Sequence, residues 1–436
     1  MVNANTVSAL SCPALFVAAP SSGQGKTTVV AALARLHSRQ GRRVRVFKCG
    51  PDFLDPQIHT IASGSPCYNV DLRMCGEDDA RNRLASAAAD ADLILVEGVM
   101  GLYDGEPSAA ELATRLGLPI LAVIDGAAMA GSFGAIAYGL KHYRPGTALT
   151  AVLANRVGSA YHAELLEKSL PPDIAWYGHL PRDVDAELPE RHLGVLPAAE
   201  IDGLAQRIER MADLLAATAA AQLPKPVSFA VRAAPCVEPL LAGKTIAVAR
   251  DEAFCFLYPA NLDCLVALGA RIVFFSPLAD RVLPDCDAIW LPGGYPELHA
   301  ERLASQRELW AALSSHVECG KPLFAECGGM MALFETLVDL DGQSHRLGGL
   351  LPGLVTMQKK LAALGMQDVE LPEGRLRGHT FHYSLAQTPL AILVRSRRAN
   401  GSPGEAVYRR QRLTASYLHL YFPSDPVAAA RLFLPA

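Results

Sequence analysis

Two segments of the sequence carry side chains whose types and spacing could do chemistry, and the first is Ala19–Thr28, which reads Ala-Pro-Ser-Ser-Gly-Gln-Gly-Lys-Thr-Thr. This pattern predicts a phosphate-binding loop: its glycines let the backbone approach phosphate oxygens, Lys26 can reach the β and γ phosphates, and Thr27 can bind Mg²⁺. Pro20 stands where the consensus has its first glycine, so the loop is a variant of the kind found in ATPases that activate carboxylates. The candidate ATP-binding residues of this segment are Gly23, Gln24, Gly25, Lys26, Thr27 and Thr28.

The second segment places Cys327 between an apolar run and a short helical stretch, followed by two glycines. This spacing predicts a nucleophile elbow, in which a tight turn lifts the thiol out of a sheet and the following helix N-terminus favours the thiolate. The backbone N–H groups of Gly328 and of Gly294, from a second glycine turn, are candidate oxyanion donors. His419, in an apolar run near the end of the chain, is the candidate general base. Together these residues could attack an amide.

Acidic residues follow two apolar runs in the first half of the chain. Asp52 and Asp55 follow one run, and Glu97 ends the other, with Asp104 after it. A carboxylate opposite a phosphate loop commonly holds the Mg²⁺ of a nucleotide, so Glu97 and Asp52 are expected to share the metal with Thr27. For Asp55 and Asp104 two interpretations stay open, a role in the chemistry or a side chain that caps its own turn.

Two further polar residues end apolar runs of the first half. Lys48 could steady a phosphoryl group during transfer, although a lysine at a strand end is also a routine surface residue. Asn155, followed by Arg156, is a candidate contact for the adenine of ATP.

The elements that must position these side chains follow an α/β rhythm. Short apolar runs alternate with alanine-rich helical stretches such as Thr27–Gln40, which predicts parallel sheets covered by helices. A proline-punctuated stretch at 223–242 predicts a linker, so we expect an ATP-binding domain at 1–222 and a second α/β domain at 243–436. The expected strands are Leu15–Ala19, Val44–Lys48, Leu93–Glu97, Ile120–Asp125, Ala151–Asn155, Thr245–Ala249, Arg271–Phe275, Ala288–Leu291 and Pro322–Ala325.

Composition narrows the class of protein. The chain has 436 residues, half of them hydrophobic, and a net charge of −4, which favours two globular cores and gives no reason to expect a nucleic acid or a membrane as partner. Its ten cysteines form no CxxC pair or zinc-spaced cluster, so we expect a reduced, cytoplasmic protein. The oligomeric state stays open, with a homodimer as one candidate.

Across nearly its whole length the sequence is similar to one known family. The second domain resembles class I, or triad-type, glutamine amidotransferases, and the first resembles the dethiobiotin-synthetase-like P-loop ATPases. The family that joins both is that of the cobyrinic or hydrogenobyrinic acid a,c-diamide synthases of cobalamin biosynthesis. The matching segments, besides the phosphate loop, are Lys48–Pro56, Glu97–Gly105, Ala154–Ser159, Pro292–Leu298, Glu326–Gly329 and Ser416–His419.

The resemblance implies an enzyme that uses ATP, Mg²⁺ and glutamine to convert the a and c acetate carboxylates of a corrinoid acid into amides through an acyl phosphate. It implies Cys327 as the glutaminase nucleophile and His419 as its base. In the first domain it implies acidic residues around the activated substrate. We expect Lys48 and Asp104 to be catalytic there and Phe53, Leu54 and Asp55 to contact the substrate.

Two positions depart from the family's patterns. Most triad amidotransferases carry a glutamate two residues after the histidine, and this chain has Tyr421 there, which agrees with the corrinoid members, since these generally lack the acid. Phe53 stands where tyrosine is common. These departures affect the expected subfamily and substrate preference more than the expected reaction.

Other functions fit parts of the same pattern. Related amidotransferases act on nickel sirohydrochlorin or make cobyric acid. A protein of another class, a P-loop switch ATPase with a binding module, would also contain the phosphate loop. A binding module has no need of a thiol at an elbow, so Cys327 argues against this last alternative.

Overall fold

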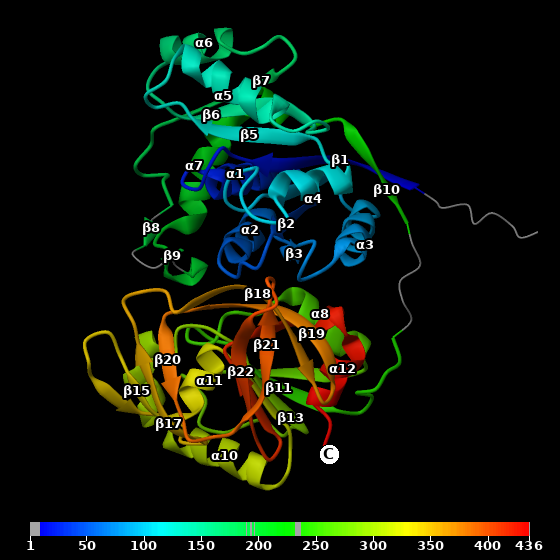
Figure 1. Cartoon of the computed structure of the whole chain (residues 1–436). Coiled ribbons are helices and arrows are strands. Elements are labelled where there is room, and N and C mark those ends of the chain that lie inside the picture. Colours follow the sequence, from blue (N-terminus) through cyan, green and yellow to red (C-terminus); the bar gives the residue numbers. More distant parts are fainter. Residues whose placement is uncertain (1–8, 189, 192–193, 196, 232–236, 436) are drawn as a thin grey trace, which may run out of the picture. The chain divides into compact units, whose positions relative to one another are not determined.

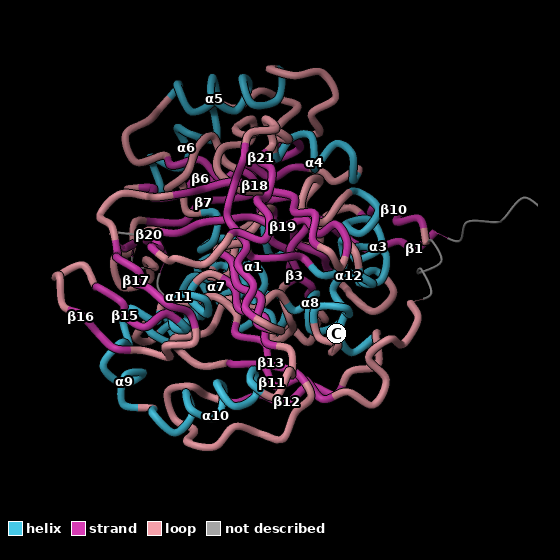
Figure 2. Tube along the Cα trace, turned by 60° about the horizontal axis from the view of Figure 1, so that its bottom comes forward, coloured by secondary structure: helices cyan, strands magenta, loops and turns pink. Residues whose placement is uncertain are grey.

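The computed structural model describes residues 9–188, 190–191, 194–195, 197–231 and 237–435, and the chain divides into two compact units between Ala234 and Pro235 (Figure 1). Each unit is an α/β structure built around its own sheet, as the sequence predicts. Strands and helices of the chain are distinguished by colour in Figure 2. None of the described helices is both long and apolar enough to cross a membrane.

The first unit contains a parallel sheet with strand order β3-β2-β4-β1-β5-β6-β7. β1 and β4 lie at its centre, and β4 is buried along its whole length. The carboxyl ends of these strands therefore meet at one edge, where the loops after β1, β2, β4 and β6 begin. The strands are β1 (Ala9–Ala18), β2 (Val44–Cys49), β3 (Tyr68–Val70), β4 (Leu93–Glu97), β5 (Ile120–Asp125), β6 (Leu149–Val157) and β7 (Ala175–Pro181), with a separate pair β8 (Glu190–Arg191) and β9 (Gly194–Val195).

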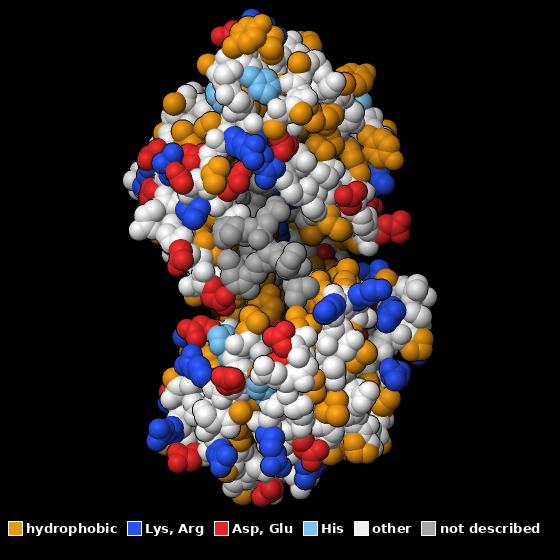
Figure 3. All heavy atoms as spheres, turned by 90° about the vertical axis from the view of Figure 1, so that its left-hand side faces the viewer, with side chains coloured by type: hydrophobic (Ala, Val, Ile, Leu, Met, Phe, Trp, Pro, Cys, Tyr) orange, Lys and Arg blue, Asp and Glu red, His pale blue; other side chains and the backbone are white. Residues whose placement is uncertain are grey.

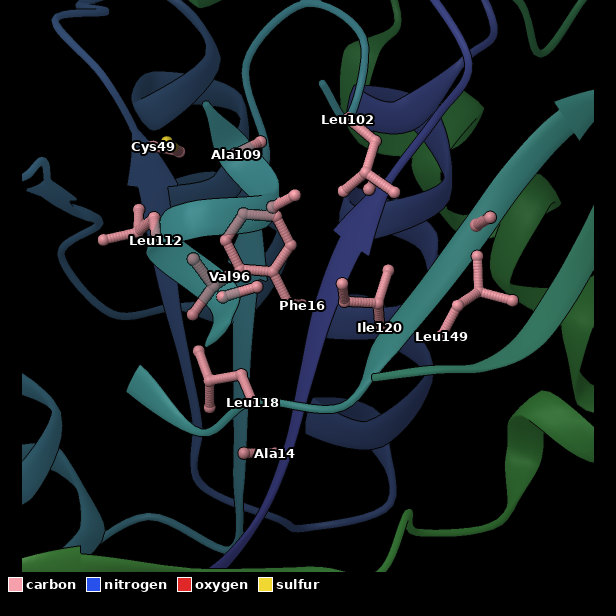
Figure 4. Packing of buried hydrophobic residues seen from close by; sticks show 14 of the residues in the cluster. Ala14, Phe16, Cys49, Val96, Leu102, Ala109, Leu112, Leu118, Ile120 and Leu149 are labelled. Carbon is pink, nitrogen blue, oxygen red and sulfur yellow. The ribbon is translucent and has the colours of Figure 1, made fainter. Parts of the chain in front are cut away.

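Helices cover both faces of this sheet. Side chains of its strands point alternately to the two faces, so each face packs against helices in a core of its own. Phe16 of β1 packs with Leu112 and Ile120 in one core, shown in Figure 4, and Val17 packs with Val30 and Ile208 in the other. The helices are α1 (Lys26–Arg39), α2 (Asp55–Ser63), α3 (Glu77–Ala88), α4 (Ala109–Leu116), α5 (Gly131–His142), α6 (Ala160–Lys168) and α7 (Leu204–Ala216), with short 3-10 turns at Ala198–Glu200 and Ala219–Ala221.

The stretch expected to be a linker, 223–242, is partly structured. Pro226–Ala230 forms strand β10, which pairs antiparallel with the first half of β1 from Ala9 to Pro13. Proline is tolerated there because β10 lies at an edge. Residues 232–236 of the expected linker lie outside the described residues.

The second unit is built on a mixed sheet with order β12-β11-β13-β14-β23-β22-β21-β18-β19-β24. The first five strands in this order are parallel and the others join antiparallel, a half that sequence analysis did not predict. The strands are β11 (Thr245–Ala249), β12 (Arg271–Phe275), β13 (Ala288–Leu291), β14 (Leu323–Glu326), β18 (Ala363–Leu371), β19 (Gly374–His382), β21 (Ile392–Arg398), β22 (Pro403–Arg410), β23 (Leu413–Ser416) and β24 (His419–Tyr421).

A small second sheet and five helices complete this unit. The sheet has order β16-β15-β17-β20, with β15 (Phe334–Val338), β16 (Ser344–Arg346), β17 (Leu351–Met357) and β20 (Ser384–Gln387). The helices are α8 (Pro259–Ala267), α9 (Ala300–Ser305), α10 (Arg307–Glu318), α11 (Gly328–Leu333) and α12 (Pro426–Leu432), with 3-10 turns at Pro296–His299 and Phe422–Ser424.

Basic and acidic side chains are interspersed over the face shown in Figure 3, in keeping with the small net charge of the chain.

Candidate active sites

The phosphate loop lies between β1 and α1, where the sequence places it. Gly23 and Gly25 have φ angles of 76° and 88°, which glycine adopts without strain, so the backbone can turn tightly around a phosphate. Lys26 begins α1 and is buried, and its Nζ donates to the carbonyl oxygens of Met100 at 2.6 Å and Ser21 at 3.2 Å. Burial lowers the pKa of Lys26 and the charge of Glu97 opposes that change.

This loop opens into a cavity of about 970 Å³ within the first unit. Residues of the phosphate loop and the expected acidic residues share its wall, so the cavity is large enough for a nucleotide next to a second ligand. Beyond the loop the wall is formed by residues after β7 and on α7. The lining residues include Gly23, Gly25, Lys26, Thr27, Thr28, Lys48, Asp52, Asp55, Glu97, Asn155 and Arg156.

A buried charge cluster lies under the phosphate loop. The ammonium of Lys48, 3% exposed, donates to Asp55 Oδ2 at 2.5 Å and Glu97 Oε1 at 2.9 Å, and lies 3.8 Å from Asp52 Oδ2. Thr27 Oγ1 donates to the same two oxygens, at 3.3 Å to Asp55 and 2.9 Å to Glu97. Lys48 is therefore an internal ion-pair partner and not a surface lysine.

Protonation in this cluster follows from burial and charge. Burial opposes the charged form of Glu97, but Lys48 and the hydrogen-bonded His59 outweigh it and hold the pKa of Glu97 well below its usual range. Burial and the charge of Asp52 raise the pKa of Asp55 to about 7, so this carboxyl can hold a proton near neutral pH. Burial also disfavours the charge of Lys48, yet Asp55 and Glu97 raise its pKa well above its usual value.

His59 is a member of the cluster that sequence analysis missed. It is fully buried in α2, and its Nε2 forms a short hydrogen bond with Glu97 Oε2. Each oxygen of Glu97 thus has a partner, Lys48 and Thr27 on one side and His59 on the other, which fixes the carboxylate plane. The sequence does contain a signal for the role of His59. It follows Asp55 by four residues, so the two side chains lie on the same face of a helix.

Other expected residues support the loops. Asp52 Oδ1 accepts from the backbone N–H groups of Leu54 at 2.8 Å and Asp55 at 3.1 Å, and Asp104 Oδ2 accepts from Gly101 N at 2.9 Å. The contact of Asp104 agrees with the interpretation that its side chain caps its own turn. The side chain of Asp55, by contrast, belongs to the ion cluster. Phe53 and Leu54 are half-buried at the start of α2, beside that cluster.

Asn155 contacts the phosphate loop. Its Nδ2 donates to Gln24 O at 2.9 Å and its Oδ1 accepts from Arg156 N at 3.0 Å, so both ends of the amide have partners within the chain. An added Cβ at Gly25 would collide with the Asn155 amide. Arg156 donates to Gly23 O at 2.9 Å. Both residues thus brace the phosphate loop, and both also line the cavity. The contact of Asn155 with adenine stays a prediction.

The donor set of the cluster fits Mg²⁺ held through nucleotide phosphates. Among the residues that the structure describes, no group of three or more His, Cys, Asp or Glu side chains could hold a metal by itself. Magnesium bound to phosphates needs only one or two protein ligands, and the Thr27 hydroxyl and the Glu97 carboxylate converge beside the phosphate loop.

In the second unit, Cys327 lies at the turn between β14 and α11 with φ 45° and ψ −109°. A non-glycine residue in this region is strained, and the surrounding hydrogen bonds hold it there. Cys327 N donates to Ser416 O at 2.7 Å, and Cys327 O accepts from Met331 N at 2.9 Å as α11 begins. This is the geometry of a nucleophile elbow.

The glycine turn after β13 packs directly against this elbow. An added Cβ at Gly328 would lie 2.9 Å from Gly294 N and 2.8 Å from Gly294 O, so the two candidate oxyanion donors belong to touching segments. An added Cβ at Gly293 would collide with the ring of His419. The elbow, the glycine turn and the candidate base are therefore neighbours, although Cys327 and His419 are 92 residues apart in sequence.

Burial sets the resting protonation of this site. It raises the pKa of the Cys327 thiol far above its usual value, with Glu297 adding to the effect. It also lowers the pKa of His419 well below its usual value, and His379 and His382 act in the same direction. The resting pair is a neutral thiol and a neutral imidazole, so the expected thiolate forms only when His419 accepts the proton.

Gly293→Ala is expected to lower kcat for glutamine hydrolysis about 100-fold, because the new Cβ displaces the His419 ring from its place beside the elbow. Synthesis with added ammonium should be unchanged, since the first unit is untouched. Steady-state assays with each nitrogen source check this. Wild-type glutaminase activity in the variant would contradict the placement of His419.

Glu326, which directly precedes Cys327, is buried, and burial raises its pKa to about 8. The folded chain thus retains a proton between about pH 5 and 8 that the unfolded chain has lost. Stability should therefore fall as pH rises across this window, by up to about 1.4 kcal/mol per pH unit from this group, and Glu326→Gln should make the slope shallower. Urea unfolding at pH 6 and 8, followed by tryptophan fluorescence, measures the slope.

Comparison with known proteins places both units. The model of the CobQ/CobB/MinD/ParA nucleotide binding domain family matches residues 15–195, and that of the CobB/CobQ-like glutamine amidotransferase domain matches residues 245–427. A hydrogenobyrinate a,c-diamide synthase of Stutzerimonas stutzeri is 58% identical over 97% of this chain and 99% of its own length.

Two further relatives extend this similarity. A hydrogenobyrinate a,c-diamide synthase of Pseudomonas aeruginosa is 58% identical over 98% of both chains. A cobyrinate a,c-diamide synthase of Herminiimonas arsenicoxydans is 48% identical over 97% of this chain and 96% of its own. The chain therefore belongs to the family of hydrogenobyrinate and cobyrinate a,c-diamide synthases.

Proposed function

We propose that the chain is a glutamine-hydrolysing, ATP-dependent ligase that converts the a and c acetate carboxylates of hydrogenobyrinic acid into primary amides. The observation that carries this proposal is 58% identity, over nearly the full length of both chains, to two relatives named for that reaction. A phosphate loop with its ion cluster and a thiol elbow in one chain supply the two chemistries that the reaction needs. ATP and glutamine are both cytoplasmic metabolites, and we place the reaction in the cytoplasm.

In the first unit, ATP phosphorylates a substrate carboxylate to give an acyl phosphate. The loop N–H groups and Lys26 would bind the β and γ phosphates. We assign to Lys48, which lines the same cavity, the role of steadying the transferred phosphoryl group. Thr27 and Glu97 would hold Mg²⁺, which neutralises phosphate charge when bound. Asp55 can exchange a proton near neutral pH and lies at the start of the segment Phe53–Asp55 that we assign to the substrate.

In the second unit, Cys327 attacks the side-chain amide of glutamine. His419 takes the thiol proton, and the N–H groups of Gly328 and Gly294 stabilise the tetrahedral oxyanion. His419 returns the proton to the leaving nitrogen, ammonia departs, and water hydrolyses the thioester to glutamate. Ammonia must reach the acyl phosphate unprotonated, because ammonium has no lone pair with which to attack.

The metal state of the corrinoid is a finer question within this proposal. The two relatives at 58% identity are named for hydrogenobyrinate, the metal-free acid, and the one at 48% for cobyrinate. We therefore propose the metal-free acid as the preferred substrate and cobyrinic acid as the second candidate.

The test is an assay with purified protein, ATP, Mg²⁺ and glutamine, with each acid supplied separately and products identified by mass. Two amide gains on hydrogenobyrinic acid, with higher kcat/KM than on cobyrinic acid, are the expected result. Amidation of nickel sirohydrochlorin, or of the remaining side chains as in cobyric acid synthesis, without a,c-diamide formation would contradict the proposal.

A further inference from the structure

The strand that carries the candidate base has an unusual support. β24 comes last in the strand order of its sheet and pairs on one side with β19, where His379 lies opposite His419. Its other side is held by two buried side chains. Asn261 donates to Leu420 O at 2.7 Å and accepts from Phe422 N at 2.8 Å. Glu326 Oε1 accepts from Leu420 N at 2.7 Å.

Glu326 connects this strand to the nucleophile. It is the last residue of β14, directly before Cys327, and its other oxygen accepts from Trp290 Nε1 of β13 at 3.0 Å. Along the sheet, five strands lie between β14 and β24. The pairing of β14 with β23 brings Ser416, three residues before His419, opposite Glu326. The Glu326 carboxyl group then extends this connection from the neighbour of Cys327 to Leu420, the neighbour of His419.

We propose that Glu326 is a positioning residue for glutamine hydrolysis, which fixes the separation of Cys327 and His419 by holding the backbone of β24. In a triad enzyme an acid bonded to the histidine ring orients the base. Here Tyr421 occupies the position of the usual glutamate, and the carboxyl before the nucleophile orients the strand that bears the base. This inference rests on the proposed glutaminase activity.

The chemistry of the site favours this role over simple packing. Burying a carboxyl group is costly, and a leucine of similar size would fill the space at less cost. A leucine would, however, leave the N–H of Leu420 without its acceptor in a buried position, and β24 could then shift relative to the elbow. Sub-ångström errors of this kind lower rates strongly in enzymes that depend on proton transfer between fixed groups.

Three variants separate positioning from packing. Glu326→Leu removes both hydrogen bonds, and Trp290→Phe removes only the one that does not reach β24. The double variant Glu326→Gln/Trp290→Phe keeps an acceptor for Leu420 N and removes the indole N–H that would face the new amide NH₂. We expect Glu326→Leu to lower kcat for glutamine hydrolysis about 100-fold with KM within about threefold of wild type. Trp290→Phe and the double variant should keep kcat within about fivefold of wild type.

Each assay is paired with ammonium-dependent synthesis, which needs only the first unit and should be unchanged in all three variants. Wild-type kcat in Glu326→Leu would overturn the proposal. So would a double variant that folds but is as slow as Glu326→Leu, because a hydrogen-bond acceptor for Leu420 N would then not suffice to hold the site. If Glu326→Leu does not fold, a double variant that folds but loses about 100-fold in kcat, against the expected loss of at most about fivefold, overturns the proposal. Failure of the wild-type chain to hydrolyse glutamine would instead refute the proposed function.

Discussion

Cys327→Ser is expected to abolish glutamine-dependent amidation, with a loss of at least about 10⁴-fold in kcat for glutamine hydrolysis. A serine hydroxyl in the same strained turn is a much weaker nucleophile than a thiol, and the neutral His419 beside it is too weak a base to activate a hydroxyl group of high pKa. Amidation with a high concentration of ammonium salt should continue at the wild-type rate, because acyl phosphate formation uses the first unit alone. Glutamate release and amide formation are measured separately.

A matched control is available in the same unit. Cys319 is exposed at the C-cap of α10, before β14 begins, whereas Cys327 follows the end of β14, so Cys319→Ser makes the same chemical change outside the site. It should retain both activities. Glutamine consumption that survives in Cys327→Ser, or ammonium-dependent synthesis that disappears with it, would refute the division of labour between the two units.

The fold and the local geometry of the motifs could be predicted from sequence because short segments dictate them. Glycines with left-handed φ angles, an apolar strand before them and a helix after them define the phosphate loop. The same strand–turn–helix pattern locates Cys327, and the structure gives it the positive φ that an elbow requires. In both segments the residues that shape the backbone are neighbours in sequence.

Contacts between distant segments could not be predicted in the same way. His59 bonds to Glu97 because α2 packs over β2 and β4, a result of tertiary packing across 38 residues. Asn155 lies in the predicted strand, which runs two residues further, to Val157, and its partner is the phosphate loop, 131 residues earlier. Glu326 reads as part of the elbow motif, and its contact with Leu420 depends on the pairing of β14 with β23, whose last residue, Ser416, lies four residues before Leu420.

The sequence of the antiparallel half of the second sheet predicts its strands only weakly. β21 and β22 pair with irregular register at two points, and β21 is largely exposed, so its sequence shows little of the alternation that identifies a strand. β19, by contrast, pairs with β18 over nine residues and carries His379 to the ring of His419, with ring centroids 4.9 Å apart. The hairpin thus places His379 directly beside the candidate base, His419.

Glu97→Gln changes the first unit and leaves the second intact, the reverse of the cysteine variant. It is expected to lower amidation about 10³-fold with either nitrogen source. The amide of glutamine carries no charge to pair with Lys48. One oxygen of Glu97 contacts Lys48 and Thr27 and the other contacts His59, and in the variant an NH₂ group replaces one of these two oxygens. Lys48 would remain buried, with Asp55 at 2.5 Å as its nearest remaining carboxyl group. Glutamine hydrolysis should persist, because Cys327 and His419 are in the other unit.

Measuring ATP binding distinguishes the loss of a metal ligand from unfolding in the Glu97→Gln variant. Titration calorimetry should show weaker Mg²⁺-dependent binding of ATP in Glu97→Gln, with the metal-free nucleotide affected less, since the carboxylate acts through the metal and Lys48 and not on the phosphates. Glu111→Gln is the matched control: Glu111 is half-buried in the first turn of α4, and glutamine also serves at this capping-box position. That control should bind and amidate as wild type does. If Glu97→Gln amidates normally with ammonium, the buried charge cluster is a structural device and the acyl phosphate must form elsewhere in the cavity.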